Sequence, residues 1–172
     1  MQGLLGTSGR RGGVNVAAAG IEQARIAAIE SGTNAHIGFP ISAANKTNAY
    51  SHFIVFRDGL SGERDVVALS RWQRLPTGVF FADDGPGFQA VATNRTGLAD
   101  LLPRLGTENL GDVRVLTFNR FGQLQTANQT VALRVGEKPE PQGAWLRSES
   151  NYYEIIVQPL TGRAVVQDRS GK

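Results

Sequence analysis

Residues 14–31 read Val-Asn-Val-Ala-Ala-Ala-Gly-Ile-Glu-Gln-Ala-Arg-Ile-Ala-Ala-Ile-Glu-Ser, and they form the one long segment that predicts an α-helix. The segment is rich in Ala and also carries Glu, Gln and Arg, all of which favour helix. Ala17, Ile21, Ala24 and Ala28 recur at steps of four and three, so they share one face. This face is small-sided, which lets another layer approach the helix closely. A helix of this length is marginal alone in water, so we expect it to pack on the rest of the chain.

The expected helix has recognisable ends and two irregular positions. Asn15 can cap its first turn, and Gly32 can terminate its last turn. Gly20 costs about 1 kcal/mol relative to Ala in the middle of a helix. Ile26 is an apolar residue on the side that the pattern assigns to polar residues.

Composition favours a single folded domain. The chain has 172 residues, of which 41% are hydrophobic and 19% charged, and this argues against overall disorder. The 21 glycines indicate many turns, as in a sheet-rich fold. A net charge of +3 permits an anionic partner without requiring one. Cysteine is absent, which excludes disulfides, thiol catalysis and Cys-based zinc sites.

The first residues differ from the rest of the chain. Residues 1–13 are Gly-rich and include Arg10 and Arg11, so we expect a flexible lead or a remnant of cloning, followed by one globular domain over residues 14–172. No apolar run approaches the roughly 20 residues that span a bilayer, and no signal peptide is recognisable. A truncation that removed a targeting or membrane segment would look the same. The absence therefore does not tell whether the natural protein has such a segment.

Most of the chain after the helix predicts β-strand. A short helix is expected at residues 96–102, within an otherwise irregular region at 83–112. Short spacings between strands indicate antiparallel pairing. The fold class is therefore α+β, with one N-terminal helix packed on antiparallel sheet. The expected strands are residues 34–39, 50–57, 65–72, 78–82, 113–118, 130–135, 152–158 and 163–167. The large apolar residues expected to pack against the helix are Trp72, Phe80, Phe118, Phe121 and Ile156.

Residues with catalytic or metal-binding chemistry are sparse. His36 and His52 lie on separate expected strands without a metal-binding spacing, so we interpret both as ordinary strand residues. Ser51, His52 and Asp58 invite comparison with a catalytic triad. The chain has no Gly-x-Ser-x-Gly elbow, however, and neighbouring strand residues point to opposite faces. Residues 83–85 (DDG) predict a plain turn rather than a calcium loop. We expect no cofactor, no metal site and no enzymatic activity.

Three stretches, taken in order, carry a resemblance to a known family. The first is residues 21–25 (IEQAR), followed by Ser31-Gly32 and a strand. The second is residues 72–81 (WQRLPTGVFF), close to a Leu-Pro-x-Gly-Val-x-Phe step. The third is residues 115–123 (VLTFNRFGQ), followed by 155–157 (IIV) and 160–165 (LTGRAV). Together they resemble the globular domain of type IV pilin-like proteins, of the minor pseudopilin H and FimT type, from about residue 14 to 167.

The resemblance implies a structural role. It implies a minor pilin or pseudopilin subunit of a type IV pilus or type II secretion pseudopilus, which takes part in filament assembly or caps the tip. Its partners are then other pilins and the assembly machinery, with the loops at 83–112 and 137–150 offering specificity. The anchoring half-helix and prepilin cleavage site of the family are missing. By the resemblance, this chain is the periplasmic or extracellular domain of a longer protein held in the bacterial inner membrane.

The resemblance also suggests an alternative function. Some FimT-like minor pilins bind DNA during uptake through basic residues around a Gly-Arg-x-Arg segment. Here residues 162–165 (GRAV) match the first arginine and replace the second with Val. The corresponding candidates for DNA binding are Arg163, Arg169 and Lys172, with Asp168 as a local counter-charge. The competing interpretation is that these are ordinary charges at a solvated strand end.

Overall fold

The structure is a computed structural model that describes residues 3–41, 50–82, 86–88, 98–105, 112–125, 130–137 and 151–170, with the side chains of residues 3–7 and 99 left aside. Residues 83–85, Thr96 and Lys172 therefore lie outside the described residues, as do most of the two loops expected to carry partner specificity.

One long helix, α1 (Gly3–Ser31), organises the molecule. Its inner face is the one expected from the sequence, because Ala17, Ile21, Ala24 and Ala28 are all fully buried. The helix ends at Ser31, and Gly32 has a positive φ of 66°, as expected for a residue that terminates a helix. Among the described residues, no helix has both the length and the apolar character that crossing a bilayer requires.

The start of α1 corrects the sequence prediction. Residues 3–13 are helical rather than a flexible lead, so Asn15 lies exposed within the helix and does not cap it. Tertiary contacts compensate for the poor helix propensity of the glycines. The Arg10 side chain is buried and its Nη1 lies 3.0 Å from Glu137 Oε1. A Cβ atom at Gly13 would lie 2.8 Å from Val79 Cγ1, so glycine lets this turn of the helix approach the sheet.

Gly20, which looked unfavourable in the sequence, has a packing role. A Cβ atom at this position would collide with the aromatic ring of Phe53, which is itself fully buried. Glycine at position 20 lowers the helix propensity, but it allows the helix backbone to lie directly on the ring.

The first sheet has the order β3-β2-β1-β6, with β4 also paired to β2, and every pairing is antiparallel. Its register places Ile37 between Val55 on one side and Leu116 on the other. Most expected strands are present within one or two residues, whereas the expected 65–72 strand is only a short edge strand. The elements are β1 (Ala35–Pro40), β2 (His52–Asp58), β3 (Val66–Ala68), β4 (Gln73–Arg74) and β6 (Val113–Phe118).

The second sheet has the order β5-β7-β8-β9 and is also antiparallel throughout. Its last strand is an edge strand that runs beside α1. At the start of this strand the backbone N–H of Ala164 donates to Glu22 Oε1 at 3.0 Å, so a helix side chain occupies part of the open edge. The elements are β5 (Val79–Ala82), β7 (Val131–Glu137), β8 (Tyr152–Val157) and β9 (Ala164–Asp168).

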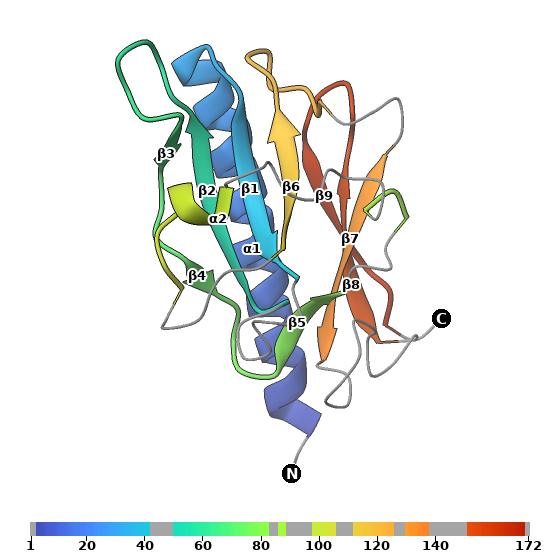
Figure 1. Ribbon diagram of the computed structural model, residues 1–172. Coiled ribbons are helices and arrows are strands. Elements are labelled where there is room, and N and C mark those ends of the chain that lie inside the picture. Colours follow the sequence, from blue (N-terminus) through green and yellow to red (C-terminus); the bar gives the residue numbers. More distant parts are fainter. Residues whose placement is uncertain are drawn as a thin grey trace.

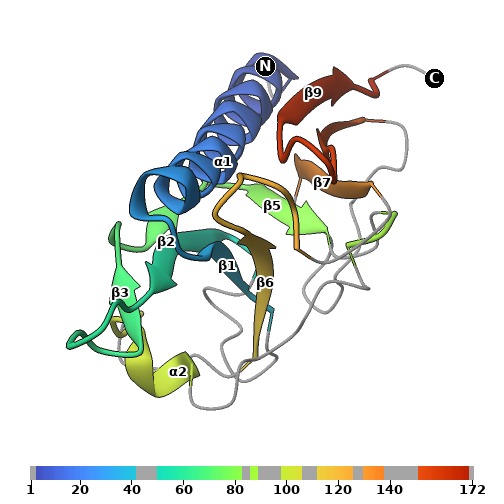
Figure 2. The same cartoon turned by 90° about the horizontal axis from the view of Figure 1, so that it is seen from above.

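The two sheets stand side by side with α1 along one face (Figure 1). A short helix, α2 (Leu98–Leu101), lies on the opposite face of the first sheet, as the view from above makes plain (Figure 2). The main core fills the space between α1 and both sheets and includes Ile21, Phe39 and Phe53. A smaller core lies between the first sheet and α2 and includes Ile54, Phe56, Leu98 and Leu102. The α+β class with one N-terminal helix on antiparallel sheet is confirmed.

Not all the expected core residues are buried. Phe118 is fully buried, but Phe121 is 67% exposed because it lies in the turn after β6. In β5 the alternation of the strand buries Phe81 and leaves Phe80 half-buried. Trp72 and Ile156 are also only half-buried. The main error in the sequence prediction was therefore to place a turn aromatic in the core.

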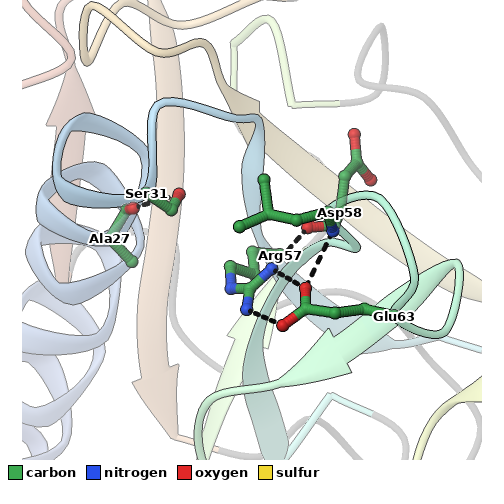
Figure 3. A network of polar contacts seen from close by, with 6 residues as sticks. Ala27, Ser31, Arg57, Asp58 and Glu63 are labelled. Carbon is green, nitrogen blue, oxygen red and sulfur yellow. Dashed lines mark hydrogen bonds and ion pairs between the residues drawn. The ribbon is translucent and has the colours of Figure 1, made fainter.

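Near the C-terminal end of α1, the β2–β3 loop is held by a surface ion pair (Figure 3). The Arg57 guanidinium donates from Nη1 to Glu63 Oε2 at 2.7 Å and from Nη2 to Oε1 at 2.9 Å. Leu60 N–H also donates to Glu63 Oε2 at 2.8 Å. These donors, of which Arg57 has the largest effect, lower the pKa of Glu63 from 4.5 to about 2.

On the helix itself, Ser31 Oγ donates to the Ala27 carbonyl at 2.6 Å.

Candidate functional site

Arg163, the first of the basic candidates, is available for a ligand. It immediately precedes β9 in the β8–β9 hairpin, where its carbonyl accepts from Gln158 N–H at 3.0 Å. Its own N–H donates to Thr161 Oγ1 at 3.3 Å. The side chain is exposed, and within the described part of the chain its guanidinium group has no hydrogen-bond or ion-pair partner.

Arg169 is occupied by a structural contact. Its Nε and Nη2 donate to Glu154 Oε2 at 3.0 and 2.8 Å, and Glu154 is buried on β8. The two arginines also flank opposite ends of β9, on the order of 20 Å apart at the rise of an extended strand. Lys172 lies outside the described residues. The structure therefore does not gather Arg163 and Arg169 into one basic site, and DNA binding stays a prediction.

The two histidines are embedded in separate local contacts. His36 Nε2 lies 2.9 Å from Asp58 Oδ1, and His36 Nδ1 lies 2.9 Å from Thr117 Oγ1. Its ring stacks on Phe56 with a centroid distance of 4.7 Å. His36 is opposite Phe56 in the sheet, whereas His52 is at the start of β2, so the two rings are separated along that strand. Among the described residues, no cluster of three or more His, Asp or Glu side chains is arranged to hold a metal ion.

The Ser51–His52–Asp58 set behaves differently from the expectation. Ser51 Oγ lies 2.9 Å from His52 Nδ1, so these neighbours do contact each other, because Ser51 is in the turn before β2 and not in the strand. Asp58 is at the other end of β2, roughly 20 Å away in an extended strand, and its carboxylate is bound to His36. The three residues therefore do not form a triad.

The outer face of α1 is the feature that sequence reasoning missed. Residues 16, 19, 23, 26 and 30 follow steps of three and four, and all of them are exposed. On this face Val16 and Ile26 have 37% and 45% of their surface exposed, whereas Ile29, 46% exposed, lies at its margin against Gly122 in the turn after β6. This outer face lies opposite the buried face and is not covered by either sheet. The signal was present in the sequence as Ile26, an apolar residue on the side assigned to solvent.

Charged side chains lie both beside this outer face and, at Glu30, on it. Glu22 and Arg25 form an ion pair with Arg25 Nε 2.9 Å from Glu22 Oε2, and Glu22 also binds the Ala164 N–H. Glu30, in the last helical turn, is an exposed acidic residue of the face itself, and Arg11 is exposed in the third turn of the helix. The outer face thus combines the apolar Val16, Ala19 and Ile26 with the polar Asn15, Gln23 and Glu30.

Comparison with known proteins identifies the fold. The chain matches no known family profile and no curated protein sequence. The type IV minor pilin FimU of Pseudomonas aeruginosa has a similar structure in two crystal forms. The first gives a TM-score of 0.54 at 11% identity and covers 92% of this chain and 93% of FimU. The second gives 0.52 at 10% identity and covers 92% and 87%. This is a likeness of fold, and it shows that the chain has a pilin-like fold.

A weaker match involves a secretion protein. The minor pseudopilin EpsH from the type 2 secretion system of Vibrio cholerae gives a TM-score of 0.48 at 7% identity, covering 92% of this chain and 94% of EpsH.

Proposed function

We propose that this chain is a structural minor subunit of a type IV pilus or of a type II secretion pseudopilus, acting in filament assembly or at the tip. The observation that carries the proposal is the outer face of α1, where Val16 and Ile26 are exposed opposite a fully buried inner face. A pilin-like fold shared with a minor pilin over most of both chains supports it. The role requires no bond-making chemistry.

In the proposed mechanism, packing propagates the filament. The outer face of α1 from one subunit packs against helices of its neighbours, and because the contact is heterologous it can repeat without closing. Its exposed side chains are small or medium-sized, so helices can approach each other closely. The partners are other pilins or pseudopilins and the assembly machinery. The site of action is the bacterial cell envelope, with this domain on the periplasmic side or outside the cell in the filament.

Cysteine cross-linking tests the proposal directly, because the chain has no cysteine of its own. Ile26→Cys is introduced into the complete gene product in its source bacterium, and envelope fractions are treated with a short bifunctional maleimide. We expect a cross-linked species that contains this chain and a second pilin. The matched control is Gln167→Cys, at another exposed position, on β9. Equal cross-linking at both positions, or none at position 26 in assembled filaments, would overturn the proposal.

DNA binding is a second candidate, favoured by one observation: the Arg163 guanidinium is exposed and has no partner among the residues that the structure describes. A gel shift across a salt series tests it with Arg163→Ala, and Arg71→Ala serves as a control at another exposed arginine. If Arg163 contacts a phosphate, the variant weakens binding for all sequences and reduces the salt slope by about 1. Absence of a shift at low salt, or an equal loss in both variants, removes this candidate.

A further inference from the structure

The first sheet has an open edge at β3. This strand lies at the rim of the molecule (Figure 1), and within the described part of the chain it pairs with β2 on one side only. Gly59 N–H donates to the Asp65 carbonyl at 3.0 Å, so in this antiparallel register Val67 directs its backbone groups toward β2. The N–H and C=O groups of the alternate residues, Val66 and Ala68, therefore point away from β2 along the open edge.

The outward backbone groups of Val66 and Ala68 have no hydrogen-bond partner among the described residues. Ala68 is exposed, whereas only 4% of the surface of Val66 is exposed. Backbone donors and acceptors in folded proteins are nearly always paired, with protein or with water. An edge that presents two residues with unpaired donors and acceptors is a template for one more strand, which carries the complementary groups at the same spacing.

A groove runs beside this open edge. It has a volume of about 350 Å³ and lies between β3 and α2, two elements that are neighbours in the view from above (Figure 2). Ala68 lies opposite Phe56 in the sheet, and Phe56 belongs to the smaller core between the sheet and α2, so the side chains of Val66 and Ala68 face the groove. The lining residues are Arg64, Val66, Val67, Ala68, Asp100, Leu101, Leu102 and Pro103.

The helical wall of the groove is fixed in place. Leu98 and Leu102 are buried in the smaller core, and Trp72 Nε1 donates to the Pro103 carbonyl at 2.7 Å. On the groove itself, Leu101 has 40% of its surface exposed. The groove is therefore preformed, with a backbone edge on one wall and apolar side chains on the other, and this reduces the entropy cost of binding.

The charges around the groove do not select its occupant. Arg64 and Asp100 both line it, so the lining carries no net charge, and Arg104 is exposed next to the lining residue Pro103. Selection therefore falls to the backbone groups of β3 and the apolar wall. An extended peptide matches both, because its backbone alternates donors and acceptors at the spacing of a strand and its alternate side chains share one face.

We propose that the groove receives an extended segment of another protein, which adds to β3 as a further strand of the first sheet. The backbone groups of the segment bond to those of Val66 and Ala68. Every second side chain of the segment enters the groove and packs against Leu101 and Pro103, which favours apolar residues at those positions. The contact uses neither the outer face of α1 nor Arg163, so it stands independently of both proposed functions.

A peptide library tests the inference, with the purified chain as bait and random heptapeptides displayed on phage as the probe. We expect enriched sequences with apolar side chains at every second position. The strongest binder is then synthesised, and its backbone amides are methylated one at a time. Methylation should weaken binding about tenfold or more at alternate positions, where the N–H groups face β3, and should have little effect at the positions between them.

Variants of the chain provide the matching measurement. Ala68→Pro deletes an outward N–H and keeps the backbone bonds of Val67 to β2, and edge strands tolerate proline at such positions. This variant should bind the peptide about tenfold more weakly or worse, whereas Ala68→Ser, which keeps the N–H group, should bind like the wild type. The control on another edge is Val166→Pro: Arg169 N–H donates to the Tyr152 carbonyl, so Val166 N–H points away from β8. Val166→Pro should leave peptide binding unchanged.

Several outcomes would overturn the inference. A library that yields no enriched peptide does so, as does a methylation pattern without a period of two, and this pattern decides the matter even if Ala68→Pro fails to fold. An Ala68→Pro variant that is folded by circular dichroism and binds like the wild type places the peptide elsewhere, as does a loss of binding in Val166→Pro alone. Self-association of the wild type that Ala68→Pro abolishes would make a second copy of this chain the occupant, in place of another protein.

Discussion

The two faces of α1 reverse the usual arrangement of large and small apolar residues. The inner face buries mainly Ala and Gly, such as Ala24 and Gly20, whereas the outer face exposes Val16 and Ile26. Small residues inside allow the backbone to lie on the ring of Phe53 and on Val79. Larger residues outside contribute little to the isolated domain. The comparison teaches that an apolar side chain need not be buried within its own chain. An apolar side chain that stays exposed can mark a contact with another molecule.

The largest expected difference between the faces comes from truncating isoleucine on each side. Ile21→Ala leaves a cavity in the main core and should reduce the free energy of unfolding by about 3 kcal/mol, within the range for large-to-small core changes. Ile26→Ala, on the outer face, should change it by less than about 0.5 kcal/mol. Urea denaturation of both variants measures the difference. Similar losses at the two positions would mean that the outer face is covered within the monomer.

Enlarging a small residue on each face should give the next largest effect. Gly20→Val places a Cβ atom against Phe53 and should cost about 2 kcal/mol, because overpacking a dense core forces side chains and backbone to shift. Ala19→Val, one residue earlier and exposed, should cost only the small loss of helix propensity. Thermal unfolding followed by circular dichroism compares them. A Gly20→Val protein as stable as Ala19→Val would contradict the close approach of helix and ring.

The N-terminal part of α1 offers a matched pair of arginines. Arg10 is buried and bound to Glu137, whereas its neighbour Arg11 is exposed. Arg10→Ala should cost about 1–2 kcal/mol through the loss of a partly buried charge-assisted hydrogen bond. Arg11→Ala should have an effect too small to resolve by urea denaturation. Equal stability of the two variants would argue that residues 3–13 are not integrated into the domain.

The smallest expected effect on stability comes from the surface ion pair between Arg57 and Glu63, which lies outside α1. Because Arg57 lowers the pKa of Glu63 from 4.5 to about 2, the ion pair stabilises the fold fully above pH 4.5. That contribution is lost as the pH falls through about 2, because below this pH Glu63 is protonated in both the folded and the unfolded state. The urea midpoints of wild type and Glu63→Gln should therefore differ slightly at pH 6 and converge near pH 2. A gap that widens in acid would reverse the assigned sign.

The sequence predicted what depends on local pattern. The spacing of Ala17, Ile21, Ala24 and Ala28 identified the inner face of α1, and β-branched and aromatic runs identified most strands. The start of the helix was missed because the glycines before Val14 have low propensity, and only their packing on Pro76 and Val79 makes them suitable. Such contacts join residues that are distant in the sequence. Helix propensity depends on local sequence and therefore does not predict them.

The candidate site was less predictable for the same reason. Arg169 looked equivalent to Arg163 until the fold placed buried Glu154 beside it. Phe121 looked like a core residue because aromatic side chains usually are, but it lies in a turn held outward by Asn119 and Gly122. In the sequence, the outer face of α1 was indicated only by Ile26, an apolar residue on the side expected to be polar. The positions of the two sheets then showed that this side of the helix is left uncovered.

The hydrogen bond from Ala164 N–H to Glu22 also bears on aggregation. β9 is the free edge of its sheet and carries exposed Val165 and Val166, two β-branched residues of the kind that stack into cross-β fibrils. A carboxylate from the helix occupies the first backbone donor at this edge. A foreign strand that adds to β9 at this end must displace the Glu22 carboxylate from the Ala164 N–H. The helix thereby covers the start of an edge that would otherwise offer its backbone donors to another chain.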